Sequence, residues 1–244
     1  MFIARIFLDQ PLNETQVISL TADHYHYLVH VIRVQVGDPL KLWNGQGGEY
    51  ESQVVDITKK AISIRLDTFS PVDRESPCHI ELVVPLLSSE KMDLVLQKSV
   101  ELGVYQISPV ICERAAVKLN AEKLEKKKAH WMQVIISAAN QSQRTRLPQL
   151  NALKPFQHFF DQYTHPIVLF TPPLAHHTPR SLPTQCQQCR ILIGPESGFS
   201  TAELRHAADK QAYFKTLGQR VLRVETAAIS CMTYAQSIWG DFNL

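Results

Sequence analysis

Residues 190–203 restrict the possible folds most strongly, because they read as a strand, a glycine loop and a helix in direct succession. The apolar run 191–193 has the length and β-branching of a buried parallel strand. Ser200 and Glu203 have the spacing of a capping box, so a helix is predicted to begin at Ser200. Open α/β sheets bind ligands beyond the carboxyl ends of their strands. We therefore expect the loop at 194–198 to form part of a binding site.

Strands and helices alternate in the chain beyond Pro77, as they do in an α/β domain with a parallel sheet. Gly103 is expected to end the first helix of this part, since glycine readily adopts the left-handed conformation that follows many helices. The predicted elements are strands at 79–87, 104–112, 167–170 and 191–193, and helices at 89–102, 121–143, 200–211 and 226–239.

The part before residue 70 is predicted to be a small β-rich unit, compatible with a barrel. Asp23 is expected to cap a short helix there, and residues 44–48 have the composition of a hairpin turn. A polar, proline-marked link at 70–77 is typical of a domain boundary. We therefore predict domains at 1–72 and 73–244. The strands expected in the first domain are 2–8, 40–43, 49–57 and 61–66.

The net charge of +2 does not by itself indicate a partner, but positive charge is concentrated at residues 118–146. Seven Lys and Arg residues stand against two Glu residues there, which suits either a polyanion or a solvated helix face. The five cysteines are scattered, and neither a signal peptide nor a run of 18 apolar residues is present. We expect a cytoplasmic protein with reduced thiols and no membrane partner.

Two common nucleotide-binding motifs are missing, since no G-x-G-x-x-G follows a predicted strand and no P-loop sequence occurs. A zinc site could in principle use Cys186 and Cys189, with His176 and His177 ten residues upstream. No second matched cysteine pair accompanies them, so we expect no metal.

Several charged side chains have two interpretations from the sequence alone. Lys98 and Glu101 are three residues apart on a predicted helix, where they either pair to shape a site or belong to a solvated face. Arg144 and Arg146 follow the long basic helix. They either bind phosphates or oppose the dipole at the helix end.

Seven segments in order resemble the RsmE family, the SPOUT-class methyltransferases that modify N3 of a uridine in small-subunit ribosomal RNA. The sequence departs from the usual family pattern at Ser197, where a second glycine is common, and at Asn140 and Gln143. The matching segments are H-Y-L-V-H-V-I-R-V-Q-V-G-D (26–38), K-M-D-L-V-L-Q-K-S-V-E-L-G-V (91–104), I-S-P-V (107–110), H-W (130–131), N-Q-S-Q-R-T-R-L-P (140–148), I-G-P-E-S-G-F-S-x-x-E (193–203) and L-G-Q-R-V-L-R-V-E-T-A (217–227).

The resemblance implies an N-terminal PUA-like β-barrel that binds RNA and a C-terminal α/β domain with a SPOUT trefoil knot. It also implies S-adenosylmethionine (AdoMet) as the methyl donor, a homodimer, and 16S ribosomal RNA or the 30S particle as the substrate. Three loops should hold AdoMet: the one after residue 170, the loop 194–198 and the segment 217–226. The cofactor residues that the resemblance implies are Phe170, Thr171, Pro172, Gly194, Pro195, Glu196, Gly198, Leu217, Gly218, Leu222 and Thr226.

The uridine N3 carries a proton, so catalysis needs a proton acceptor and a group that stabilises charge on the base. Arg223 is the candidate for stabilising that charge or for holding a phosphate. Glu225 and Glu196 are the candidates for accepting the proton or orienting Arg223, and a plain salt bridge between residues 223 and 225 is the alternative. The candidate RNA-binding residues are Arg33, Lys98, Arg144 and Arg146.

Two other functions fit the same residues. A SPOUT ribose 2′-O-methyltransferase would share the donor site, and a non-catalytic RNA-binding or ribosome-assembly protein would bind RNA without AdoMet. The sequence does not specify which uridine is modified, or whether free RNA or an assembled subunit is the substrate. The identity of the general base and the effect of Ser197 on the donor loop are also left open.

Overall fold

The computed structural model describes residues 3–115, 121–173 and 180–242. The chain divides into two compact units, and the division is not the simple one at residue 72 that the sequence suggested. The first unit comprises Met1–Glu75 together with Ala139–Leu147, and the second comprises Ser76–Ala138 and Pro148–Leu244. A short distant segment, 139–147, thus belongs to the N-terminal unit.

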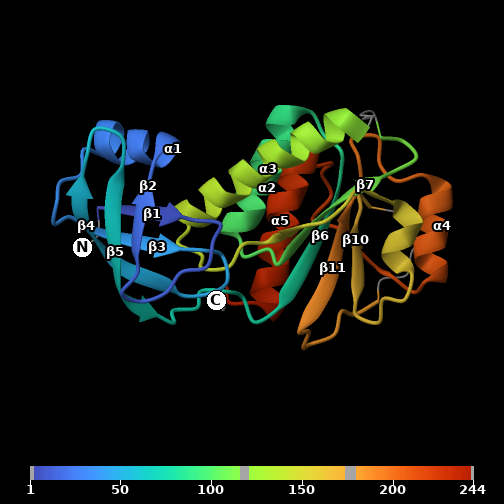
Figure 1. The fold of residues 1–244 in the computed structure, drawn as a ribbon. Coiled ribbons are helices and arrows are strands. Elements are labelled where there is room, and N and C mark those ends of the chain that lie inside the picture. Colours follow the sequence, from blue (N-terminus) through green and yellow to red (C-terminus); the bar gives the residue numbers. More distant parts are fainter. Residues whose placement is uncertain (1–2, 116–120, 174–179, 243–244) are drawn as a thin grey trace. The chain divides into compact units, whose positions relative to one another are not determined.

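The first unit is built on a curled five-stranded sheet with the order β1-β3-β4-β5-β2 (Figure 1). β1 and β3 are parallel and the other neighbours are antiparallel, with β3 and β4 joined by the hairpin predicted at 44–48. Two register shifts in β4–β5 increase the curl. In the described residues the edge strands β1 and β2 do not pair with each other, so the sheet is not closed. The strands are β1 (Ala4–Phe7), β2 (Val17–Leu20), β3 (Pro39–Trp43), β4 (Glu49–Ile57) and β5 (Ile62–Ser70).

A short helical segment covers this sheet between β2 and β3. It consists of α1 (Ala22–Tyr25) and the π-helix η1 (His26–Ile32). The predicted cap at Asp23 was wrong: the N-cap is Thr21, and Asp23 lies in the first turn, where its negative charge still favours a helix N-terminus. Leu28 of η1 is fully buried in the core formed with the sheet.

The side chain of Arg5 explains why residues 139–147 belong to the first unit. Its guanidinium donates to Arg144 O at 2.7 Å and to Glu49 Oε2 at 3.0 Å. Trp43 Nε1 donates to Asn140 Oδ1 at 3.0 Å. The contact partners are far apart in sequence, so no local pattern could reveal this arrangement.

The second unit contains a parallel sheet with the order β12-β10-β11-β6-β7-β8, and β9 pairs with β7 beside β8. Its strands are mostly apolar and buried on both faces, as expected for a parallel sheet. The strands are β6 (His79–Pro85), β7 (Gln106–Ile111), β8 (Gln149–Leu150), β9 (Lys154–Pro155), β10 (Ile167–Phe170), β11 (Gln188–Ile193) and β12 (Tyr213–Lys215).

Helices cover both faces of this sheet (Figure 1). α5 packs against α2 and the central strands β6 and β11, whereas α4 and the 3-10 helix η2 lie together on the opposite face around Phe156 and Ala207. The helices are α2 (Ser89–Glu101), α3 (Ala121–Gln141), η2 (Phe156–Phe160), α4 (Thr201–Asp209) and α5 (Val224–Trp239), with the last part of α3 in the first unit.

The local predictions succeed best where a cap defines an element. Ser200 is the N-cap of α4, and both hydrogen bonds of the predicted capping box with Glu203 are present. α5 begins two residues before the predicted position, with Arg223 as its N-cap.

Among the described helices, none combines the length and the apolarity needed to cross a membrane.

Candidate active site

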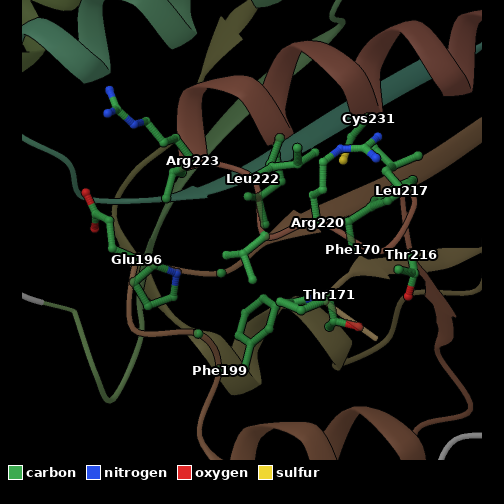
Figure 2. Close-up of a pocket in the computed structure, with 18 of the residues that line it drawn as sticks. Phe170, Thr171, Glu196, Phe199, Thr216, Leu217, Arg220, Leu222, Arg223 and Cys231 are labelled. Atoms are coloured by element: carbon green, nitrogen blue, oxygen red, sulfur yellow. The ribbon is translucent and has the colours of Figure 1, made fainter. Parts of the chain in front are cut away.

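A cavity of about 430 Å³ lies in the second unit, beyond the carboxyl ends of β10, β11 and β12 (Figure 2). This is the edge at which parallel α/β sheets bind ligands. Thr171 N donates to Lys215 O at 3.0 Å and so connects the ends of two of these strands. The wall residues are Phe170, Thr171, Pro172, Ile193, Gly194, Pro195, Glu196, Gly198, Phe199, Leu204, Thr216, Leu217, Arg220, Val221, Leu222, Arg223, Val224, Ala227 and Cys231.

The loop between β11 and α4 forms one wall. At Gly194 an added Cβ would lie 3.2 Å from the Phe199 ring, so the residue must be small for this close packing. Gly198 has a φ of +72°, a conformation that glycine adopts without strain. Ser197 does not have a positive φ, and its hydroxyl donates to Arg114 O at 2.7 Å. The serine therefore fits a loop in which only the following glycine is left-handed.

The start of α4 fixes the far end of this loop. Glu203 is buried, and its Oε2 accepts from the backbone of Ser200 at 2.7 Å. Its Oε1 accepts from Glu113 N at 2.9 Å, which connects α4 to the chain after β7. A single carboxylate therefore caps a helix and joins two loops near the cavity.

The loop between β12 and α5 forms another wall, to which it contributes apolar side chains as well as the arginines at 220 and 223. Leu217 and Leu222 line the cavity together with Phe170 from the end of β10 (Figure 2). Gly218 has a φ of +74°, which lets the loop turn between the two leucines. Apolar surfaces with accessible backbone groups between them are typical of small-molecule sites.

Charged groups gather at one end of the cavity, where Figure 2 places Glu196 and Arg223. Lys91 Nζ from α2 lies 2.8 Å from Glu196 Oε1. This hydrogen bond is the main cause that lowers the pKa of Glu196 and raises that of Lys91. The charges of Glu225 and Arg223 also act on the pKa of Lys91, so all four groups share one electrostatic environment.

Glu225 and Arg223 differ in their surroundings. The Glu225 Oε2 atom is buried and has no hydrogen-bond partner in the part of the chain that the structure describes. Arg223 is exposed at the start of α5. No ion pair joins the two within the described ranges, so the simple salt bridge considered from the sequence is not observed.

Most of the cofactor residues implied by the family resemblance line this cavity. Gly218 and Thr226 do not line it, and neither does the catalytic candidate Glu225. The loop expected at 217–226 also contributes Arg220, Val221 and Val224. Sequence reasoning did not single out Ile193, Phe199, Leu204, Thr216, Ala227 and Cys231. Ala227 and Cys231 are recognisable only once α5 is known to present them to the cavity.

The four candidate RNA-binding residues have different environments. Arg33 is exposed at the end of η1, and Lys98 bonds Glu101 at 2.8 Å, as the spacing of that pair predicts. Arg146 is half exposed and donates to Gln46 O at 3.1 Å. Arg144 is buried and ion-paired with Glu75, so the expected phosphate contact does not agree with its position.

Comparison with known proteins identifies the class of protein to which this fold and cavity belong. A family model described as an RNA methyltransferase domain matches residues 74–236, and one described as an RNA methyltransferase PUA domain matches residues 20–67. Two relatives named ribosomal RNA small subunit methyltransferase E come from Buchnera aphidicola strains. One is 32% identical over 99% of this chain and 98% of its own, and the other is 30% identical over 98% and 95%.

Solved structures agree with this class. A putative methyltransferase from Legionella pneumophila with bound cofactor SAM has a TM-score of 0.91 and 33% identity, covering 99% of this chain and 100% of its own. The ribosomal RNA small subunit methyltransferase E from Neisseria gonorrhoeae, bound to S-adenosyl methionine, has a TM-score of 0.88 and 28% identity at the same coverage. The chain therefore belongs to the ribosomal RNA small subunit methyltransferase E family.

Proposed function

We propose that this protein transfers a methyl group from AdoMet to N3 of a uridine in 16S ribosomal RNA of the small subunit. The observation that carries the proposal is the cavity beyond β10, β11 and β12, whose walls come from the loops implicated by the family motifs. The full-length similarity to relatives named for this class, including structures that hold SAM, supports the same assignment.

The cavity suits AdoMet in size and character. Its volume of about 430 Å³ falls in the range of small-molecule sites. Leu217, Leu222 and Phe170 would hold the adenine between apolar surfaces, and the backbone near Gly194 and Gly218 would approach the ligand closely. When bound, AdoMet supplies an electrophilic methyl group on a positively charged sulfur.

The residues at the charged end of the cavity would handle the proton of the target base. Glu225 has a buried carboxylate oxygen without a partner in the described chain, so it is available to accept a proton or to orient Arg223. Glu196 is less suited to this role, because its bond to Lys91 lowers its pKa and weakens it as a base. Arg223 would stabilise negative charge on the uracil oxygens or hold an adjacent phosphate.

The nucleic acid must present an accessible base, since N3 is engaged in a paired uridine and the target has to be unpaired or extruded. Arg33, Arg146 and Lys98 remain candidates for phosphate contacts. The family assignment also supports a PUA-like barrel, a SPOUT trefoil knot, a homodimer, a cytoplasmic location, and small-subunit RNA or the 30S particle as the partner.

The test combines binding, transfer and product analysis. Calorimetry should detect AdoMet binding, and methyl incorporation should be compared between free 16S RNA and 30S particles. Mass spectrometry of digested RNA should locate the methyl group on the base. A methyl group on the ribose would favour the 2′-O-methyltransferase alternative, and RNA binding without AdoMet binding would favour a non-catalytic assembly protein.

The matched variants for the site are Arg223→Ala and Arg205→Ala. Arg205 is an exposed arginine on α4 that does not line the cavity. We expect the first variant to bind AdoMet normally but lose transfer at saturating RNA, while the second behaves as the wild type. Full transfer by Arg223→Ala under these conditions would reject the proposed role of Arg223.

A further inference from the structure

Three cysteine thiols meet at the edge of the second unit's sheet opposite the cavity. Cys189 is the second residue of β11, Cys186 lies two residues before that strand, and Cys78 directly precedes β6. These strands are parallel neighbours, with Cys189 opposite Ile80 in the register. The three Sγ atoms all lie within 4.8 Å of one another. The cavity borders the carboxyl ends of the strands, so the cluster is separate from it.

The positions of the thiols suit a ligand that reaches the cluster from one side. Cys78 and Cys189 are 1% and 0% exposed, whereas Cys186 is partly exposed and donates to Gln188 O at 3.0 Å. Arg190, on the same strand, forms an ion pair with Glu81 and lies over the Tyr163 ring at 3.8 Å. Part of the cluster is therefore accessible, while two sulfurs are shielded from water.

The distances are close to those of a metal site with three sulfur ligands. Zinc–sulfur bonds of about 2.3 Å place ligating sulfurs roughly 3.8–4.0 Å apart. The observed limit of 4.8 Å thus requires sulfur movements of less than about 1 Å, which side-chain rotation supplies. A disulfide would use only two of the three sulfurs and would not explain why the third converges on them.

We propose that Cys78, Cys186 and Cys189 bind one thiophilic d10 metal ion, Zn²⁺ or Cu⁺. Thiolate ligands select these ions, and three cysteines supply three metal–sulfur bonds. Each thiol loses its proton to solvent when its sulfur binds, and no group is oxidised or reduced. The bound ion would connect the amino ends of β6 and β11, which are adjacent in the sheet but distant in the sequence.

This site was not expected from the sequence, where the Cys186–Cys189 pair lacked a matching partner. Cys78 supplies the third ligand from a distant part of the chain. The neighbouring His176 and His177, considered from the sequence, lie outside the described residues, and the proposal does not use them. The proposal is also independent of methyl transfer.

The test uses the full chain, reduced and freed of metal with a chelator. Zn²⁺ is titrated against a chromophoric competitor, and Cu⁺ is titrated separately without oxygen. We expect one equivalent of at least one ion to bind and to raise the Tm. Cys78→Ser, Cys186→Ser and Cys189→Ser should each weaken binding by more than about 100-fold, because even residues that only orient metal ligands contribute roughly 10–100-fold.

The control is Cys112→Ser, a buried cysteine outside the cluster, which should bind the ion as the wild type does. If a cluster variant does not fold, thiol alkylation of the wild type tests the site instead. Bound metal should slow alkylation of Cys186 and leave the alkylation rate of Cys112 unchanged. The proposal is overturned if reduced protein binds neither ion, if Cys78→Ser binds as tightly as the wild type, or if metal gives Cys186 no protection. A disulfide in the oxidised protein without metal binding in the reduced one would point to a redox pair instead.

Discussion

Lys91 Nζ lies 2.8 Å from Glu196 Oε1, and this ion pair joins the first turn of α2 to a loop of the cavity. The hydrogen bond favours the ionised carboxylate and is the main cause of the lowered pKa of Glu196. Replacement of Lys91 by Met should therefore move the pKa of Glu196 up towards its ordinary value. Carboxyl NMR titration measures the change. Lys126→Met is the control, because it breaks an equally short pair with Glu122 elsewhere.

The two carboxylates near the cavity should differ in their effect on catalysis. Glu225→Gln should reduce the single-turnover rate by about 10²–10⁴-fold, the usual contribution of a general base. Glu196→Gln should reduce it by less than about tenfold, because Glu196 is already paired with Lys91 and is a weak base. AdoMet affinity, measured by calorimetry, should stay near the wild-type value for Glu225→Gln. If Glu196→Gln lost more of the rate than Glu225→Gln, Glu196 would be the general base instead.

Local features of both sheets were predictable because their causes are local. Ser200 and Glu203 are three residues apart, and their hydrogen bonds depend only on the start of a helix. Residues 44–48 form the predicted turn between β3 and β4 for the same reason. The loops of the cavity follow directly from strand ends, and the family motifs identified about half of its lining residues.

Contacts between distant residues were not predictable in this way. Lys91 and Glu196 come from different elements, and Cys78 is more than 100 residues from Cys186 in the sequence. Their approach depends on the strand order of the sheet, which places β6 beside β11. Arg144 and Arg146 looked equivalent in the sequence. They differ in their tertiary surroundings, since Arg144 is buried against Glu75 whereas the Arg146 side chain is about half exposed.

The close packing at Gly194 leads to a prediction for AdoMet binding. Gly194→Ala would place a Cβ 3.2 Å from the Phe199 ring at the wall of the cavity. Overpacking of this kind costs about 1–3 kcal/mol. Because Phe199 lines the cavity, a ring displaced by the Cβ would take up space that the ligand needs, and we expect AdoMet affinity to fall by about tenfold or more. Gly37→Ala is the comparison, because its φ of +97° makes the added Cβ strain the backbone of the other unit, away from the cavity, so AdoMet affinity should stay unchanged. Unchanged AdoMet affinity in Gly194→Ala would mean that Phe199 moves aside at no cost.

Glu49 is predicted to stabilise the first unit. It is 2% exposed and accepts from Lys41 Nζ at 2.7 Å and Arg5 Nε at 3.0 Å. Burial alone raises its pKa, but the hydrogen bonds and charges of Lys41 and Arg5 outweigh burial, and the net pKa is lowered. Glu49→Gln leaves the buried Arg5 without its carboxylate partner, so it should cost about 3–5 kcal/mol of unfolding free energy at pH 7.

The pH dependence of this effect has a definite sign. A lowered pKa in the folded state means that the stabilisation is complete above the unfolded pKa of about 4.3 and is lost as the pH falls through the folded pKa. The difference in unfolding free energy between the wild type and Glu49→Gln should therefore shrink below about pH 4.3. Urea unfolding, monitored by hydrogen exchange in β3 and β4, measures this difference. Asp67→Asn, which breaks the exposed pair with Arg65, should cost less than about 1 kcal/mol.

The different burial of Arg144 and Arg146 predicts different consequences for two similar substitutions. The Arg146 side chain is 51% exposed, so Arg146→Ala should weaken RNA binding and reduce the slope of log K against log salt by about 0.7–0.9, as expected for one lost phosphate contact. The Arg144 side chain is 5% exposed and bonds Glu75, so Arg144→Ala should lower the unfolding free energy by about 3–5 kcal/mol. Salt-dependent RNA binding and urea unfolding of both variants distinguish these roles. If Arg144→Ala kept wild-type stability but lost one phosphate contact, Arg144 would have to leave its pair with Glu75 to reach RNA, and our structural role for it would be wrong.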